Sequence, residues 1–347
     1  CKHKLIVPNK YNEQKCMRDD TVLRHFTTTF KFFPRFKTQK VKPWDVDKVH
    51  EVLNCHEFDW LLDDYKDWKK KTKKIIPIFF TIDDAFAPFV SVAICSLLAN
   101  ANPDYFYNIH IVNNGLSEAN KEKILTLEND FSKIIFNNMD ERLKAITDKK
   151  GTRLREDYFS LAIFFRIFIP DCFKEYDKAL YIDSDTVIVD DVSKLYNIDL
   201  GGKYIGGCPE TSCIGIDEIT NYFTNGVGVD YHEYINSGML LFDMKALRDS
   251  NFADKFLSLF HKYNFGNVDP DQSYINAILK DKKKLINNRW NATISKDNKI
   301  VENPGIIHFN LFKKPWHYDN VCCEDIFWQY AKKTPYFNEI KGIKDKY

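Results

Sequence analysis

Short apolar runs alternate with segments typical of helices along the chain from residue 75 onward. We predict strands over residues 78–82, 108–112, 134–136, 179–182, 204–207, 237–242 and 305–309. We predict helices over residues 88–98, 117–130, 159–168, 253–263 and 271–279. Pro77 is expected at the beginning of the first strand, and Ser117 is expected to cap the second helix. The helix over 159–168 is nearly all apolar and carries one charge, Arg166.

This alternation predicts an α/β fold, with a mostly parallel mixed sheet flanked by helices on both faces. Ligands bind at the carboxyl ends of the strands in sheets of this kind, so we expect the chemistry directly after strands.

The two ends of the chain differ from this central pattern. Residues 1–74 are predicted to be a partly helical N-terminal extension, with a helix over 45–68. Residues 30–36 of this extension are mostly aromatic and basic. The lysine-rich run 69–74 is interpreted as a solvated junction. Residues 75–320 are predicted to form the main α/β domain. Residues 321–347 are predicted to form a helical tail that packs on the core, with peripheral membrane contact as the alternative.

Composition excludes some classes of function. The 347 residues carry 50 basic and 49 acidic side chains. There is no excess of basic residues of the kind that would indicate a nucleic-acid partner. The nine cysteines show no C-x-x-C spacing, which favours free thiols in a reducing, cytoplasmic compartment. No apolar stretch is long enough to predict a membrane span, and no signal peptide is visible.

The most informative segment is Leu-Tyr-Ile-Asp-Ser-Asp at 180–185, where a buried strand ends in two carboxylates. An extended chain would place Asp183 and Asp185 on the same side, where they repel each other unless a cation lies between them. Oxygen ligands favour Mg²⁺ or Mn²⁺. The alternative is a solvated turn. Asp190 and Asp191 are interpreted as acids at the start of a helix.

A second candidate segment follows the last predicted strand. His308 ends the apolar run 305–309 and is a plausible third metal ligand. Lys314, six residues later, is positioned to bind a diphosphate as a compact positive charge. A structural histidine and a solvated lysine are the alternatives.

These segments together resemble glycosyltransferase family 8, which includes bacterial lipopolysaccharide galactosyl- and glucosyltransferases. The motifs that carry the resemblance span about residues 75–320 and are the segments 81–84, 180–185, 234–241, 271–272 and 308–316. The resemblance implies that residues 75–320 are a catalytic domain with a GT-A fold, one half of which is a Rossmann-like nucleotide-binding unit. It also implies a UDP-sugar donor, Mn²⁺ (or Mg²⁺) and retention of the anomeric configuration.

The resemblance also assigns roles to individual residues. The implied metal ligands are Asp183, Asp185 and His308. The implied donor contacts are Thr81 and Asp83 on uracil and ribose, Arg166, Ser184, Lys314 on the diphosphate, and Glu210 on the sugar. The implied catalytic residues near the transferred sugar are Asn236, Asp271 and Gln272. Ala85 stands where several relatives carry an asparagine, which leaves that contact in doubt.

Several of these residues have a simpler structural interpretation. Arg166 would be a buried charge with structural partners, Asp271 a helix cap, Asp83 a turn acid and Asn236 the start of a strand.

The function predicted from these residues is transfer of glucose or galactose from a UDP-sugar to a glycan, lipid-linked or protein acceptor. Because glutamine is a poor nucleophile, we favour attack from the same face as the leaving group over a covalent intermediate. A nucleotidyltransferase that uses a similar acidic metal site is one alternative. A non-catalytic module that binds nucleotide sugars or glycans is the other.

Overall fold

The computed structural model describes residues 73–139, 164–212, 216–263, 269, 271–295, 297–311 and 313–346. Residues from Lys74 onward form one compact unit. The predicted extension over 1–74, its helix over 45–68 and the first part of the helix predicted over 159–168 lie outside the described residues, apart from the last two residues of the extension.

The core of the unit is a seven-stranded sheet with the order β3-β2-β1-β4-β7-β6-β8. Its strands are β1 (Lys74–Thr81), β2 (Tyr105–Asn113), β3 (Ser132–Asn138), β4 (Lys178–Ile182), β6 (Ile205–Pro209), β7 (Ile235–Asp243) and β8 (Lys283–Leu285). β7 runs antiparallel to both of its neighbours, and the other pairs are parallel. The prediction of an α/β fold with a mostly parallel sheet is therefore confirmed.

Pro77 lies within β1 rather than at its beginning, so that prediction is wrong. The strand starts at Lys74, and Pro77 faces Asn108 of β2 in the register. Pairing with β4 on the other side begins only at Ile78. Proline lacks the N–H that a central strand needs, and here it stands on the part of β1 that has one strand neighbour.

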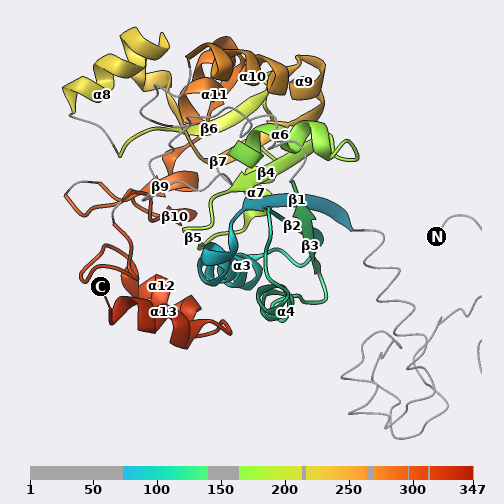
Figure 1. The fold of residues 1–347 in the computed structure, drawn as a ribbon, viewed down its shortest axis with the longest axis vertical. Helices are drawn as coiled ribbons and strands as arrows, with labels where there is room; N and C mark the ends of the chain where they lie inside the picture. Colours follow the sequence, from blue (N-terminus) through green and yellow to red (C-terminus); the bar gives the residue numbers. More distant parts are fainter. Residues whose placement is uncertain are drawn as a thin grey trace, which may run out of the picture. The chain divides into compact units, whose positions relative to one another are not determined.

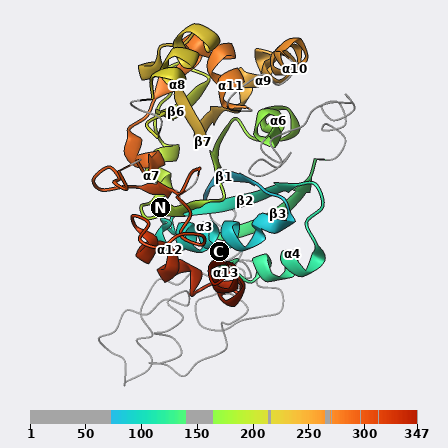
Figure 2. The same ribbon diagram turned by 60° about the vertical axis from the view of Figure 1, so that its left-hand side comes forward.

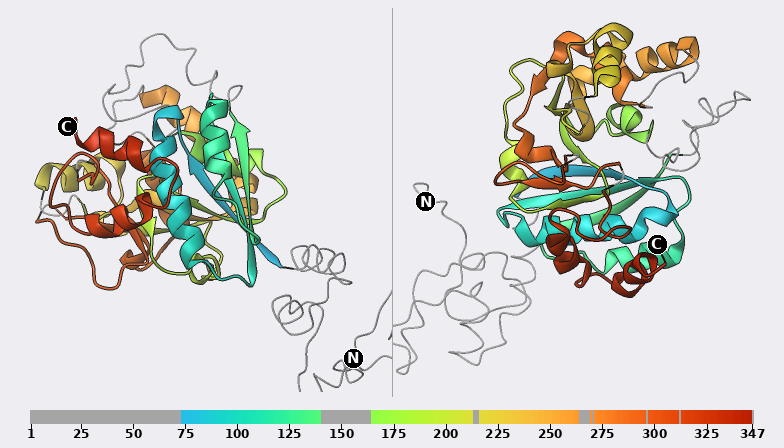
Figure 3. Two further views of the ribbon diagram at one scale, coloured as in Figure 1. Left: turned by 90° about the horizontal axis from the view of Figure 1, so that it is seen from below. Right: turned by 90° about the vertical axis from the view of Figure 1, so that its left-hand side faces the viewer.

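Helices cover both faces of the sheet (Figure 1). The helices and helical turns are η3 (Asp84–Phe86), α3 (Ala87–Asn100), α4 (Glu118–Leu125), α6 (Phe165–Cys172), α7 (Val192–Tyr196), α8 (Asp217–Asn221), η5 (Tyr222–Val227), η6 (Tyr231–Glu233), α9 (Met244–Asp249), α10 (Phe252–Tyr263), α11 (Gln272–Ile278), η7 (Lys280–Lys282), η8 (Asn288–Asn291), α12 (Glu324–Ala331) and α13 (Phe337–Lys344). In Figure 3, the orange helices lie above the strands in the right-hand view, and the teal helix α3 lies below them.

Alternation along the central strands divides the core in two. Ile78 and Phe80 of β1 pack into the cluster that contains α3, whereas Phe79 packs into the cluster that contains α6, α9 and α10. Leu180 and Tyr181 of β4 divide in the same way. Strands buried on both faces explain why the predicted runs are continuously apolar rather than alternating.

The helix predicted over 117–130 is shorter than expected. Ser117 caps it as predicted, but α4 ends at Leu125. The Asn129 side chain accepts the N–H of Phe131 and the hydroxyl of Ser132, which forms a polar turn directly before β3. Side chains of this type compete with the helical backbone for hydrogen bonds, so the helix stops early.

A small second sheet, with the order β5-β10-β9, lies beside the main one. Its strands are β5 (Thr186–Ile188), β9 (Ala292–Thr293) and β10 (Ile306–His308). β10 pairs with β5 so that His308 faces Thr186. This pairing brings the end of β10 to the segment that directly follows β4.

The C-terminal helices pack against the core, as predicted for the tail. Figures 1 and 2 both show α12 and α13 beside α3. Phe327 of α12 and Ile340 of α13 are buried in the same apolar cluster as α3. None of the helices in the described part of the chain is long and apolar enough to cross a membrane. The five cysteines described, Cys95, Cys172, Cys208, Cys322 and Cys323, are free thiols, as predicted.

Candidate active site

Two aspartates follow β4, and backbone hydrogen bonds fix both of them. The N–H of Asp183 donates to the carbonyl of Gly238 on β7 at 2.8 Å. The carbonyl of Asp185 accepts the N–H of Phe309, directly after β10, at 3.0 Å. The acidic pair is therefore held between the two sheets, at the carboxyl end of a buried strand where ligands are expected.

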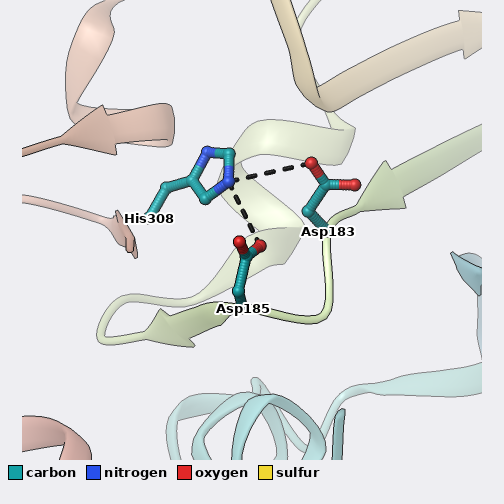
Figure 4. Close-up of side chains that lie close together, drawn as sticks. All are labelled: Asp183, Asp185 and His308. Atoms are coloured by element: carbon teal, nitrogen blue, oxygen red, sulfur yellow. Dashed lines mark ion pairs between the residues drawn. The ribbon is translucent and has the colours of Figure 1, made fainter. Parts of the chain in front are cut away.

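The imidazole of His308 faces both carboxylates (Figure 4). Its Nε2 atom lies 3.2 Å from Oδ1 of Asp185 and 3.7 Å from Oδ2 of Asp183. One donor atom from each of the three residues lies within 4.8 Å of the others. Two carboxylates and one imidazole form a donor set that suits Mn²⁺ or Mg²⁺, so the geometry fits the cation that the sequence predicts.

Lys314 is the cation nearest to this cluster in the described ranges, and it contacts Asp185 directly. Its Nζ donates to Oδ2 of Asp185 and, at 2.5 Å, to the carbonyl of Phe309. Burial raises the pKa of Asp185, but the charges of Lys314 and His308 outweigh burial and hold that pKa well below its usual value. Asp185 is therefore a carboxylate, as a metal ligand must be.

Arg166 on α6 connects the acidic pair to the neighbouring helix α11. The guanidinium is 4% exposed and lies 3.1 Å from Oδ1 of Asp183 and 3.0 Å from Oδ2 of Asp271. It also donates to the carbonyl of Ser237 at 2.6 Å and lies over the ring of Tyr181. The structural interpretation of Arg166 as a paired buried charge therefore holds, and these same contacts place it at the site.

Asp271 precedes α11 but does not cap it with its side chain. The carboxylate turns instead toward Arg166. Burial is the largest effect on Asp271 and raises the pKa of its carboxyl, and Asp183 raises it further, against the opposing effect of Arg166. Interpreting Asp271 as a simple helix cap is therefore wrong.

Three more of the predicted residues form one hydrogen-bonded group. Asn236 donates to Oε2 of Glu210 at 2.6 Å, and Gln272 donates to the same oxygen at 3.3 Å. Oε1 of Gln272 accepts the N–H of Ser237 at 2.9 Å. All three side chains are buried: Glu210 directly follows β6, Asn236 lies on β7, and Gln272 begins α11.

Thr81, Asp83 and Ser184 lie at the ends of the adjacent strands β1 and β4. Thr81 hydrogen-bonds to the hydroxyl of Tyr181 at 2.9 Å. Ser184, which stands between the two aspartates in the sequence, is buried. Asp83 accepts the N–H of Phe86 at 3.2 Å and so caps η3, which contains Ala85. The interpretation of Asp83 as a turn acid therefore holds, while its assigned role on the nucleotide stays a prediction.

Of the other two acids near the site, Asp191 has the helix-start role that the sequence predicts, whereas Asp190 lies outside the helix. Asp191 caps α7 by accepting the N–H of Ser193 at 2.8 Å. Asp190 pairs with Arg289 at 2.8 Å and with Lys194 at 2.6 Å.

Sequence reasoning missed four residues of the site: Tyr181, Gly238, Asp269 and Asn291. The hydroxyl of Tyr181 donates to Asp183 at 2.6 Å, and Asn291 lies 2.8 Å from Nδ1 of His308. Asp269 accepts from Gln272 at 3.2 Å and from the Tyr234 hydroxyl at 2.7 Å.

Three of these four residues lay in or beside a segment that had been singled out. Tyr181 and Gly238 lie inside the segments 180–185 and 234–241, and Asp269 stands two residues before Asp271. Their contacts, rather than their positions, were missed. Asn291 carries no comparable local signal.

A sequence profile described as glycosyl transferase family 8 matches residues 77–320. A putative glycosyltransferase of Haemophilus influenzae is 29% identical over 262 residues, which are 75% of this chain and 74% of that protein. The lipopolysaccharide 1,2-glucosyltransferase of Escherichia coli is 23% identical over 301 residues, covering 82% of this chain and 80% of that one.

Solved structures show the same fold. The galactosyltransferase LgtC, in complex with donor and acceptor sugar analogues, superposes with a TM-score of 0.63 at 22% identity, covering 75% of this chain and 96% of that one. The bifunctional glycosyltransferase WbbM gives a TM-score of 0.66 at 21% identity, covering 78% of this chain but only 52% of the longer WbbM chain.

The profile covers well over half of the chain, and its limits enclose every residue of the site described above. This match favours a glycosyltransferase over a nucleotidyltransferase and over a non-catalytic binding module. The fold, the site and the profile agree that the chain belongs to glycosyl transferase family 8 and is a glycosyltransferase.

Proposed function

We propose that the enzyme transfers a hexose, glucose or galactose, from a UDP-sugar with retention of configuration and with Mn²⁺ or Mg²⁺ at Asp183, Asp185 and His308. The observation that carries the proposal is the convergence of these three side chains within 4.8 Å. The names of the E. coli glucosyltransferase and of the galactosyltransferase LgtC support a hexose donor. When bound, such a cation offsets the charge of the diphosphate as it leaves.

Lys314 supports the same role. Its ammonium group lies at the acidic pair, where it would neutralise a phosphate oxygen of UDP after turning from Asp185. Thr81, Asp83 and Ser184, at the ends of β1 and β4, would hold the nucleoside side of the donor. Glu210, Asn236 and Gln272 form the polar wall against which the sugar would lie.

The contacts of Asp271 and Gln272 favour front-face attack over a covalent intermediate. The Asp271 carboxylate is engaged by Arg166, which lowers its nucleophilicity. Both polar atoms of the Gln272 amide are already hydrogen-bonded. The bond from the anomeric carbon to the phosphate oxygen would break as the acceptor oxygen bonds from the same face. The acceptor's proton would pass to the leaving phosphate oxygen.

The acceptor is proposed to be a glycan, a lipid-linked glycan or a protein. Lipopolysaccharide synthesis is one setting, supported by the name of the E. coli relative. We propose a cytoplasmic location, with peripheral contact at the inner face of the plasma membrane as an extension of that proposal.

The proposal is tested with a panel of UDP-sugars and Mn²⁺, scored for binding and for slow hydrolysis without an acceptor. UDP-glucose or UDP-galactose is expected to be hydrolysed, and UDP-galacturonic acid tests the hexose assignment. Asp185→Asn is expected to abolish turnover while the protein stays folded. The control is Asp190→Asn, which changes an acid outside the cluster that pairs with Arg289 and Lys194. This variant should keep its turnover.

Unchanged turnover in Asp185→Asn would refute the assignment of the metal site. A product with inverted configuration, detected by NMR, would refute the retaining mechanism alone. Formation of pyrophosphate from UTP and a sugar 1-phosphate would identify a nucleotidyltransferase instead.

A further inference from the structure

A chain of buried side chains connects His308 to the polar wall of the site. Nδ1 of His308 lies 2.8 Å from Oδ1 of Asn291, and Nδ2 of Asn291 donates to Oδ1 of Asn236 at 2.7 Å. Nδ2 of Asn236 then donates to Glu210 at 2.6 Å. Asn291 is 2% exposed, so each of its contacts is shielded from water.

The direction of every hydrogen bond in this chain is fixed by its ends. The N–H of Gly238 donates to Asn236 at 2.8 Å, so that atom of Asn236 must be its carbonyl oxygen. The amide nitrogen of Asn236 therefore faces Glu210, whose carboxylate accepts. Because Asn236 presents its oxygen to Asn291, the nitrogen of Asn291 must face Asn236. The oxygen of Asn291 is then left for His308.

An oxygen at Nδ1 requires that the proton of the neutral imidazole be on Nδ1. Nε2 faces Asp183 and Asp185, and without a cation these carboxylates would hold a proton there as well. A cation bound between them would take the place of that proton, and Nε2 would then present its lone pair to it. Without an acceptor at Nδ1, the nearby Asp185 oxygen would favour the opposite arrangement, with the proton on Nε2. That proton would occupy the position at which a cation must bind.

We infer that Asn291 is a positioning residue that holds His308 with its proton on Nδ1 and its Nε2 lone pair toward the cation site. The inference rests on the proposed metal-dependent function. Partners of metal-bound histidines commonly fix the ring in this way, and their loss weakens metal binding by about 10- to 100-fold. Asn291 also joins this ligand to Asn236, so the metal side and the sugar side of the site share one rigid connection.

The test compares Mn²⁺ affinity, measured by electron paramagnetic resonance with and without UDP, in three variants. Asn291→Leu removes the acceptor and is expected to weaken Mn²⁺ binding by about 10- to 100-fold. Asn291→Asp keeps an oxygen for Nδ1 and should retain affinity within about threefold. It should nevertheless unfold at lower temperature, because its second oxygen faces that of Asn236. Thr293→Val serves as the matched control.

The control is close in space. Thr293 pairs with His308 in the strand register, and its buried hydroxyl lies 3.1 Å from that of Thr211. The valine variant therefore removes a polar contact beside His308 without touching Nδ1, and it should bind Mn²⁺ like the wild type. Circular dichroism shows that each variant is folded before its affinity is measured.

Two results would overturn the inference alone: wild-type affinity in Asn291→Leu, or equal loss in Asn291→Leu and Asn291→Asp. Equal loss would mean that Asn291 acts only through packing. A wild-type protein that binds no Mn²⁺, with or without UDP, would overturn the proposed function and this inference with it.

Discussion

Adding a single methyl group at Gly238 should disrupt metal binding while the protein still folds. Gly238 lies on β7 directly against the predicted metal ligands. A Cβ atom there would stand 2.3 Å from Cε1 of His308 and 2.8 Å from Oδ2 of Asp183. Ordinary contacts begin at 3.4 Å, so the His308 ring would have to move by about 1 Å. Metal sites tolerate only about 0.2 Å of such displacement.

We therefore expect Gly238→Ala to reduce Mn²⁺ affinity by at least the roughly 10- to 100-fold that loss of a supporting residue causes. The packing cost should be about 1–3 kcal/mol in the free energy of unfolding. Isothermal titration calorimetry with Mn²⁺ and UDP measures the first quantity, and chemical denaturation measures the second.

Gly206→Ala is the matched control for this experiment. A Cβ at Gly206 would meet side-chain atoms of Ile286 at 2.6 Å and of Leu200 at 3.0 Å, far in sequence from the ligands. Gly206→Ala should likewise lower the free energy of unfolding by about 1–3 kcal/mol, because it overpacks the core in the same way. It should leave the Mn²⁺ affinity unchanged. Wild-type Mn²⁺ affinity in Gly238→Ala would refute the placement of the cation against β7.

Three further predictions concern other parts of the domain. Burial raises the pKa of Asp269 to about 7, so the folded state holds a proton that the unfolded state releases near pH 4. Stability should fall as pH rises from about 4 to 7, and Asp269→Asn should flatten this slope in denaturation curves taken across that range. Arg166→Met should cost about 3–5 kcal/mol, measured by denaturation, because Asp183 and Asp271 lose their buried partner; an unchanged midpoint would contradict the pairing. Phe327→Ala should cost about 3–5 kcal/mol while the folded fraction keeps wild-type Mn²⁺ affinity; a loss below 1 kcal/mol would show that α12 adds little to the core.

The sequence predicts six of the seven strands of the main sheet and the acidic pair, since these depend on local pattern. The short strands β5, β8 and β9 were not predicted, because two or three residues carry too little pattern. Strands buried on both faces are continuous apolar runs, and the carboxyl end of such a run is marked by its first acids, as at Asp183. Propensity alone misjudged the end of α4, where the polar turn at Asn129 overrides the helical pattern. It also misplaced Pro77, because the sequence does not reveal that β4 joins β1 only from Ile78.

The parts of the site that sequence reasoning missed depend on contacts between distant segments. Asn291 matters only because η8, where it lies, adjoins β10 and the start of β7. Gly238 stands in a motif that had been singled out, but the space that its missing side chain leaves for His308 is a property of three dimensions. The directions of amide hydrogen bonds likewise follow from neighbours that no spacing rule supplies.

The small sheet of β5, β10 and β9 has a consequence for how the domain assembles. The lysine that meets Asp185 is separated from it by 129 residues of chain, and His308 reaches the same place only after β10 has paired. A growing polypeptide therefore exposes its acidic half-site long before the complementary half is synthesised. The complete cation site would therefore exist only after β10 has paired with β5. A cation at about 100 times its dissociation constant would then raise the free energy of unfolding of the paired state by about 2.7 kcal/mol.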